Sequence, residues 1–242
     1  MFTIGIAGLK VGIDNRYEYV EKQCADYRVR GEADLVVKAT EEDIAREVAH
    51  STEEVRTTVK DLRGYSESVC IYRNLAYRLP EYDALLLHGA AVARGDEAYI
   101  FSAPSGTGKS THLRLWVKAH GDELQVINGD KPILRRQEDG KFKVYGTPWS
   151  GKEGWENDVS ATLAGLCFLR RGKKNEIARI ELREAAERIF KQIVFPRDTA
   201  ALTKMLQLLD AVIRSCPVYL LACDISPEAA ELSYRTMTEN KA

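Results

Sequence analysis

A loop of small residues with one lysine is the stretch whose residue types could most directly do chemistry. Residues 102–111 read Ser-Ala-Pro-Ser-Gly-Thr-Gly-Lys-Ser-Thr and join an apolar run, 97–101, to an amphipathic run, 112–117. Strand, loop and helix in this order are the context of a phosphate-binding loop, in which backbone N–H groups and the positive end of the helix dipole face phosphate oxygens. The pattern G-x-x-x-x-G-K-[ST] is met except at its first position, where Ala103 replaces glycine.

The residues of this loop suit a nucleoside triphosphate. Lys109 supplies a mobile positive charge for the outer phosphates, and the Ser110 hydroxyl suits the Mg²⁺ ion that bridges them. Gly106 and Gly108 keep the backbone unhindered where the loop is tightest. The alternative is a Gly/Ser-rich turn that contains a lysine by chance. We predict that the residues that bind ATP are Ser105, Gly106, Thr107, Gly108, Lys109, Ser110 and Thr111.

An aspartate downstream of the loop and a histidine upstream could complete a phosphotransfer site. Asp130 follows an apolar run, 124–127, where a neighbouring strand would present a carboxylate for Mg²⁺ or for proton transfer. The alternative is a turn aspartate, since Asn-Gly, which precedes it, is a hairpin dipeptide. His88 lies in an apolar stretch, 84–93, where a hydrogen-bonded core histidine is the competing interpretation.

Composition restricts the class of partner and the compartment. The 242 residues carry 35 Lys and Arg against 36 Asp and Glu, so no overall bias toward nucleic acid or an anionic membrane exists. The five cysteines are scattered and lack the close pairs of a zinc site, which predicts reduced thiols in a cytoplasmic protein. We expect no secretory signal, because no basic region precedes the short apolar run at the N-terminus. No segment approaches the roughly 20 apolar residues of a membrane span.

The elements that must position these residues divide the chain into two predicted domains. Residues 1–80 are expected to form a small α/β domain without identifiable chemistry. Its predicted elements are a strand or hairpin over 2–13, a helix capped by Asn15 and running to residue 28, a strand over 33–38, a helix opened by a Thr40–Asp43 capping box, and a helix over 65–79 that Pro80 ends.

Residues 81–242 are predicted to be the P-loop domain, an α/β fold with a mixed sheet. The loop 146–155 is polar, interrupted by glycine and carries two tryptophans, which is typical of functional loops. Two strands over 84–93 and 97–101 lead into the lysine loop. The other predicted elements are strands over 124–127, 161–169 and 218–222, a hairpin over 133–145, and helices over 182–193, over 202–213 and from Pro227.

The order His88-Gly89, lysine loop, Asp130 resembles the catalytic domain of HPr kinase/phosphorylase over residues 83–170. That family shares its nucleotide-binding core with ATP-dependent phosphoenolpyruvate carboxykinase. The resemblance implies this core as the fold, His88 near the reacting phosphate, and Asp130 as the base beside the metal. The family commonly has two adjacent acids where this chain has Gly129-Asp130, and we expect Glu153 to supply the missing metal ligand. The resemblance also implies that the protein forms a homo-oligomer.

The predicted function is transfer of the γ-phosphoryl group of ATP to a hydroxyl, on a serine of a peptide or protein or on a small metabolite. A nucleotide-binding regulatory module without transfer is an alternative, which the single acid at 129–130 favours. A nucleoside monophosphate kinase is another, because residues 104–111 also resemble the guanylate kinase loop. Candidate donors that stabilise transferred charge are Arg135, Arg170 and Arg171.

Overall fold

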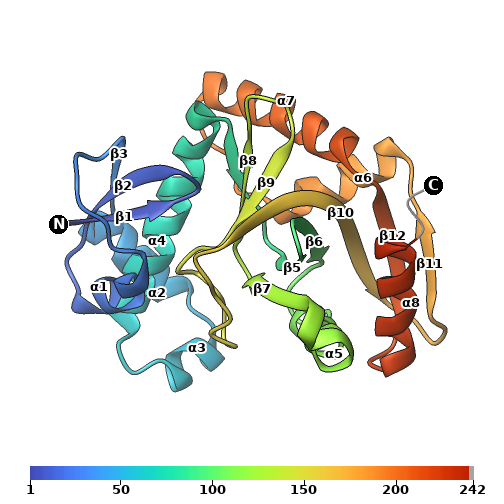
Figure 1. Cartoon of the computed structure of the whole chain (residues 1–242). Helices are drawn as coiled ribbons and strands as arrows, with labels where there is room; N and C mark the ends of the chain where they lie inside the picture. Colours follow the sequence, from blue (N-terminus) through green and yellow to red (C-terminus); the bar gives the residue numbers. More distant parts are fainter. Residues whose placement is uncertain (240–242) are drawn as a thin grey trace.

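A computed structural model describes residues 1–239, whose N-terminal part is a three-stranded sheet with helices packed on it. β1 (Phe2–Ile6) and β2 (Leu9–Asp14) form the predicted hairpin, and β3 (Leu35–Lys38) runs parallel to β2. The helices of this part are α1 (Glu18–Gln23), α2 (Glu41–His50), α3 (Glu53–Thr58) and α4 (Leu62–Arg78). Helix α4 contacts α1, α2 and β3, so it forms the centre of this part (Figure 1).

The predicted helix from Asn15 to residue 28 is wrong at both ends. The N-cap of α1 is Tyr17, which makes no side-chain capping bond, and the helix ends at Gln23 before a 3₁₀ turn. The carboxylate of Glu67, on α4, accepts the backbone N–H of Arg16 at 2.6 Å and of Tyr17 at 2.9 Å. A distant side chain therefore binds the backbone directly before the helix, where a local cap was predicted.

Two other helices begin at residues whose own side chains cap them. The Thr40–Asp43 capping box is confirmed, because the Thr40 hydroxyl accepts the N–H of Asp43 and the Asp43 carboxylate accepts that of Thr40. Helix α4 begins three residues before its predicted start, because Asp61 caps it by accepting the N–H of Gly64 at 2.9 Å. Pro80 follows in a 3₁₀ turn, and the short helix α3 was not predicted.

The second part is a nine-stranded mixed sheet, which confirms the predicted α/β class (Figure 1). Its main path has the order β4-β8-β9-β10-β6-β5-β7, and β12 pairs with β10 and with β11. The predicted strand over 84–93 is wrong, because it is two strands, β4 and β5, separated by residues 87–89, and β11 was not predicted. The strands are β4 (Ala84–Leu86), β5 (Ala90–Arg94), β6 (Glu97–Ser102), β7 (Leu124–Asn128), β8 (Ile133–Arg136), β9 (Phe142–Tyr145), β10 (Ser160–Arg171), β11 (Glu176–Arg179) and β12 (Val218–Cys223).

Strand directions bring distant residues to one edge of this sheet. β5 is antiparallel to both β6 and β7, so these two run in the same direction, and β10 is parallel to β6. The carboxyl ends of β6, β7 and β10 therefore share an edge, at which β5 begins. This edge carries the lysine loop, residues 128–130 and the residues that precede β5.

Helices cover both faces of the large sheet (Figure 1). Helices α6 (Leu182–Ile189) and α7 (Thr199–Ser215) share a hydrophobic core with one face. Helices α5 (Lys109–His120) and α8 (Pro227–Thr238) pack on the other, where Trp116 and Tyr234 meet edge to face at 5.2 Å. Within residues 1–239, no helix has the length and apolar character of a membrane span.

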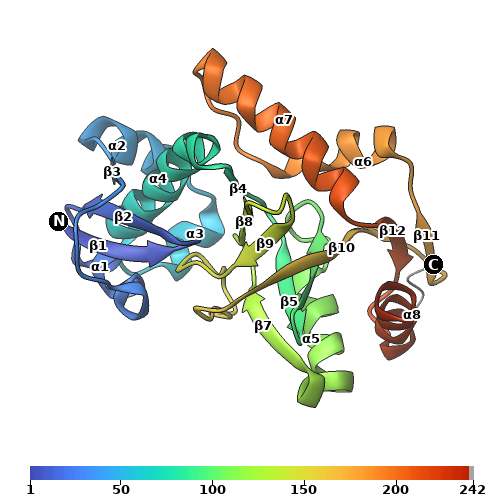
Figure 2. The ribbon, with the colours of Figure 1, turned by 45° about the horizontal axis from the view of Figure 1, so that its top comes forward.

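The two parts of the chain lie against each other (Figure 2). A third hydrophobic core joins them. It contains the apolar residues of β1, β2, β3 and α4, together with Ala84, Leu86, Ile133 and Trp149. These four residues are at most 5% exposed, so both sides of the predicted boundary at residue 80 are buried against each other. The division into domains 1–80 and 81–242 stays a prediction.

Candidate functional site

The loop between β6 and α5 has the backbone of a tight anion-binding turn. Gly106 has a φ of 74° and Gly108, the residue that precedes α5, has a φ of 119°. A Cβ atom added at either position would meet no atom within 4 Å, so conformation, and not space, requires glycine there. Ser105 and Gly106 are exposed, whereas Thr107, Gly108, Ser110 and Thr111 are half-buried.

Lys109 is buried at the first position of α5. Its side chain reaches back over the loop, and Nζ donates to the carbonyl oxygen of Ala103 at 2.9 Å. Burial lowers the pKa of Lys109 to about 8; Asp130 raises that pKa and Lys131 lowers it further. The ammonium group is therefore still charged near neutral pH and lies within electrostatic reach of both residues.

His88 and Gly89, which precede β5, lie against the other two chain segments of the edge. The Ser102 hydroxyl, at the end of β6, donates to the His88 carbonyl oxygen at 2.7 Å. The N–H of Gly89 donates to the carbonyl oxygen of Asp130 at 3.0 Å. A Cβ at Gly89 would lie 2.9 Å from Ile100, so a close approach of strands requires glycine here. The three predicted catalytic residues His88, Lys109 and Asp130 thus share one sheet edge.

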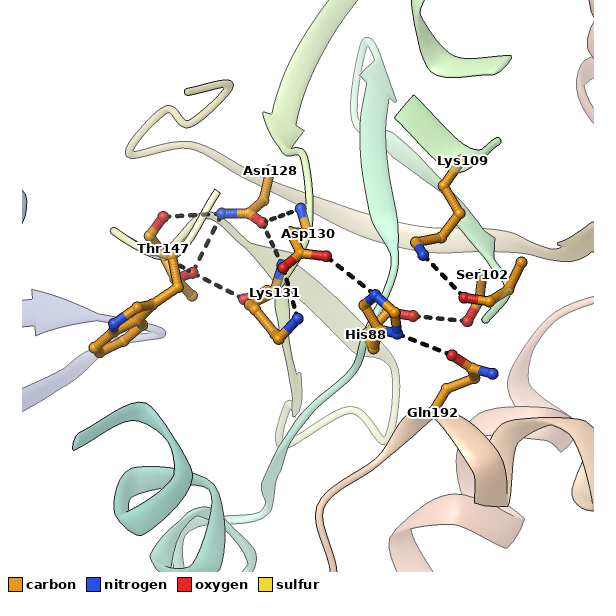
Figure 3. A network of polar contacts seen from close by, with 10 residues as sticks. His88, Ser102, Lys109, Asn128, Asp130, Lys131, Thr147 and Gln192 are labelled. Carbon is orange, nitrogen blue, oxygen red and sulfur yellow. Dashed lines mark hydrogen bonds and ion pairs between the residues drawn. The ribbon is translucent and has the colours of Figure 1, made fainter. Parts of the chain in front are cut away.

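His88, Asp130 and Lys131 form a chain of charge-assisted contacts (Figure 3). Nε2 of His88 lies 3.1 Å from Oδ1 of Asp130, and Nζ of Lys131 donates to Oδ2 at 2.6 Å. On the opposite side of the ring, Nδ1 of His88 bonds the side chain of Gln192 at 3.0 Å. Because a carboxylate only accepts, His88 presents a protonated Nε2 to Asp130.

The Asp130 carboxyl is held ionised. Burial raises its pKa, but the hydrogen bond from His88 and the ammonium of Lys131 outweigh burial and lower the pKa to about 2. An ionised carboxylate suits a hard divalent cation or a hydrogen bond from an acceptor hydroxyl. It is also a weak proton acceptor while both partners remain in place.

Asn128, fully buried at the end of β7, fixes the turn that carries Asp130. Its Oδ1 accepts the backbone N–H groups of Asp130 at 2.9 Å and of Lys131 at 2.6 Å. Its Nδ2 donates to the carbonyl oxygen of Thr147 at 2.8 Å, and the Thr147 hydroxyl donates to the Lys131 carbonyl oxygen at 2.8 Å (Figure 3). One buried amide therefore ties the turn that carries Asp130 to the loop 146–155.

The same loop is fastened to the N-terminal part of the chain. Trp149 is 5% exposed, and its indole N–H donates to the Ser68 hydroxyl of α4 at 3.0 Å. The Tyr72 ring, one helical turn further along α4, meets Trp149 edge to face at 6.1 Å and lies 5.7 Å from Nζ of Lys131. Residues of α4 thus support both the loop and the lysine that contacts Asp130.

The loop 146–155 also leaves no space for a side chain at position 129. A Cβ at Gly129 would lie 2.7 Å from the carbonyl oxygen of Ser150, closer than real Cβ contacts allow. The N–H of Gly129 also donates to the Trp155 carbonyl oxygen at 2.8 Å. In this arrangement the position has no room for the first acid of the family to which residues 83–170 were compared.

Glu153, the expected replacement ligand, points elsewhere. Its carboxylate pairs with Arg114 at 2.5 Å. Within residues 1–239 no group of three or more His, Cys, Asp and Glu side chains is placed to hold a metal ion. The other two predicted metal ligands are Asp130, which is ionised, and Ser110, in the first turn of α5.

The three candidate arginines lie in different surroundings. Arg135 donates to the Ala7 carbonyl oxygen at 2.7 Å, in the turn of the N-terminal hairpin, and is not near the loop. Arg171, at the carboxyl end of β10, donates to the Gly106 carbonyl oxygen at 2.8 Å and so contacts the lysine loop itself. Arg170 is exposed on the same strand.

Sequence reasoning missed Lys131 and Gln192. Lys131 follows Asp130 directly, so its charge was a readable signal for a partner of that carboxylate. Gln192 lies 104 residues from His88, at the end of a 3₁₀ turn after α6, and nothing local marks it as a histidine partner.

Comparisons with known proteins add little to this geometry. No family model matches the chain, and no curated protein matches it. Among solved structures, it is similar to the HPr(Ser) kinase/phosphatase from Coxiella burnetii, with 13% identity over 53% of this chain and 88% of that chain, at a TM-score of 0.27. A likeness this loose carries no argument about function, which depends here on the residues of the edge.

Proposed function

We propose that this protein is an ATP-dependent kinase that transfers the γ-phosphoryl group to a hydroxyl acceptor, in the manner of the HPr kinase-like core that residues 83–170 resemble. The observation that carries the proposal is the meeting of Lys109 and Asp130 at one sheet edge. A cation at a glycine-rich turn and an ionised carboxylate facing it are the two parts that phosphoryl transfer needs most.

In the proposed reaction, the N–H groups of residues 106–109 and the ammonium of Lys109 bind the β- and γ-phosphates of ATP. The acceptor hydroxyl donates a hydrogen bond to Asp130, which His88 and Lys131 hold in position. As the acceptor oxygen bonds to the γ-phosphorus, the bond to the β-phosphate oxygen breaks and ADP leaves. The hydroxyl proton passes to Asp130 late in this step, which suits a carboxylate of low pKa.

The proposed metal is Mg²⁺, and Asp130 and Ser110 would hold it. When bound, Mg²⁺ neutralises charge on the phosphates and orients them. The ionised state of Asp130 fits this role, although Asp130 would have to share its carboxylate with His88 and Lys131, and Glu153 would have to leave Arg114. Lys131 supplies a fixed positive charge beside Asp130 in either case.

Phosphoryl transfer from labelled ATP tests the proposal directly. The acceptors to try are serine peptides, small hydroxylated metabolites, GMP and AMP, and the last two also test the nucleoside monophosphate kinase alternative. We expect Asp130→Asn to lose about 10²- to 10⁴-fold in rate while remaining folded. The matched controls are Asp122→Asn and Lys118→Ala, which change exposed residues and should keep the full rate. Full activity of both Asp130→Asn and Lys109→Ala would refute the assignment.

A regulatory module that binds nucleotide without transferring phosphate is the second candidate. The contact of Ser150 over Gly129 favours it, because that contact leaves one acid where related kinases commonly have two. A rise in the melting temperature with ATP and Mg²⁺, together with no turnover on any acceptor of the panel, would select this function over the kinase.

A further inference from the structure

A cleft of about 450 Å³ lies away from the lysine loop, between α2, α4 and the segment before α7. This volume is within the usual range of small-ligand sites, roughly 300–1,000 Å³. Figure 2 shows α2 and α4 side by side at the N-terminal end of the molecule. The charged groups of the lining come from these three segments and are Arg46, Arg73, Arg197, His50, Asp43 and Glu47.

The lining leaves one guanidinium group unmatched. Arg73 pairs with Glu47 at 3.0 Å. Arg46 lies 3.9 Å from Asp43 and pairs at 3.0 Å with Glu42, which is outside the lining, so both arginines already have acidic partners. Arg197, which is exposed, has no hydrogen bond or ion pair to any residue between 1 and 239. The guanidinium group of Arg197 is therefore the positive charge of the cleft that is left without an acidic partner among residues 1–239.

Arg197 is nevertheless within electrostatic reach of the other wall. The pKa of Asp43 is lowered, first by the hydrogen bond from the Thr40 hydroxyl, and to a smaller degree by the guanidinium groups of Arg46 and Arg197. Two guanidinium groups from separate segments thus act on one carboxylate. A second anion placed between them would gain the same attraction.

We propose that this cleft binds a small organic anion through carboxylate or phosphate groups, with Arg197 as its main contact. A guanidinium group presents a planar fork of donors that matches either group in a bidentate pair. The cleft shares no residue with the lysine loop, so this binding is independent of the proposed kinase function and can be tested without it.

Thermal denaturation with citrate and with inorganic pyrophosphate tests the proposal, at constant ionic strength set with KCl. A ligand that binds only the folded state raises the melting temperature, and we expect a rise of about 2 °C or more at saturation. A response to citrate alone identifies a carboxylate ligand, and a response to pyrophosphate alone a phosphate ligand. Lys109→Ala serves as the background, because pyrophosphate could also bind the lysine loop.

The expected pattern is a shift that survives in Lys109→Ala and in Arg183→Gln and disappears in Arg197→Gln. Arg183 is a matched control, since it lies outside the cleft and its side chain is 92% exposed. Arg46→Gln provides a second cleft variant, and melting without ligand shows that each variant is folded. The proposal is overturned if neither anion shifts the Lys109→Ala protein, or if Arg197→Gln and Arg46→Gln both respond as fully as Arg183→Gln.

Discussion

At the scale of single residues, three positions near the site require glycine, for two different reasons. Gly106 and Gly108 are required by their backbone angles, while Gly129 is required by the Ser150 carbonyl oxygen above it. The first kind of glycine is visible in a sequence motif. The second kind is not, because the obstructing atom comes from a loop twenty residues further along the chain.

Gly129→Ala should destabilise the protein by about 1–3 kcal/mol, because its Cβ would force the Ser150 backbone to move. Urea unfolding measures this free energy. Gly121→Ala is the control. Gly121 has a helical φ of −53°, and a Cβ there would make an ordinary contact of 3.9 Å with Val117, so alanine should be neutral or stabilise by up to about 1 kcal/mol. Equal stabilities of the two variants would contradict the packing of Ser150 over Gly129.

His112 makes a second prediction at this scale, about pH. It is 3% exposed, Nε2 bonds the Ser233 hydroxyl at 2.9 Å, and Nδ1 has no hydrogen-bond partner within residues 1–239. Burial lowers the pKa of His112 to about 4, below the unfolded value of about 6.5. The unfolded state therefore binds the proton more tightly, and stability is lost as pH falls from 6.5 toward 4, by about 3 kcal/mol in total.

Urea unfolding of the protein without nucleotide, in the presence of a chelator, measures this loss. The difference in unfolding free energy between wild type and His112→Gln should shrink as the pH falls from 6.5 to 4, because only the wild type loses this contribution. A difference that stays constant over this range would show that His112 titrates normally.

At the scale of elements, the loop 146–155 connects α4 to the turn that carries Asp130. Asn128 bonds the loop from one side, and the pair of Trp149 and Ser68 bonds it from the other. The motion of this loop would carry both Gly129 and Lys131 with it. The N-terminal part of the chain therefore has a structural role at the site, although it supplies none of the predicted catalytic residues.

Ser68→Ala should cost about 1–3 kcal/mol of stability, because it leaves the buried indole N–H of Trp149 without its acceptor. Ser160→Ala changes an exposed serine at the start of β10 and should have almost no effect. Urea unfolding followed by tryptophan fluorescence gives both values. An unchanged stability of Ser68→Ala would mean that this bond does not hold the loop.

Elements marked by local chemistry could be predicted from the sequence. The Thr40–Asp43 box, the hairpin around Asp139-Gly140 and the strand and helix beside the lysine loop are such cases. The failures share another cause, which is a partner distant in the sequence. Glu67 replaced the Asn15 cap, and Gln192 reached His88 from beyond α6. The pattern of a single sequence does not show which side chain, distant along the chain, will form a hydrogen bond with a given residue.

At the scale of the whole molecule, one hydrophobic core crosses the predicted domain boundary. Ala84, Leu86, Ile133 and Trp149 are buried by residues of the N-terminal part. We expect a fragment comprising residues 81–242 to melt at a lower temperature than the full chain or to aggregate, because that surface becomes exposed. A fragment as stable as the full chain would instead support two independent domains.

The homo-oligomer that the family resemblance implies is a separate expectation, and light scattering on the full chain would test it.

The central claim is that the edge of the large sheet around Lys109 binds the phosphates of ATP, and calorimetric titration with ATP and Mg²⁺ tests it most directly. We predict one site per chain in the wild type, at least about tenfold weaker binding in Lys109→Ala, and unchanged binding in Lys118→Ala, which alters an exposed lysine of the same helix. No heat with the wild type, or equal affinities of the Lys109→Ala and Lys118→Ala proteins, would contradict the claim.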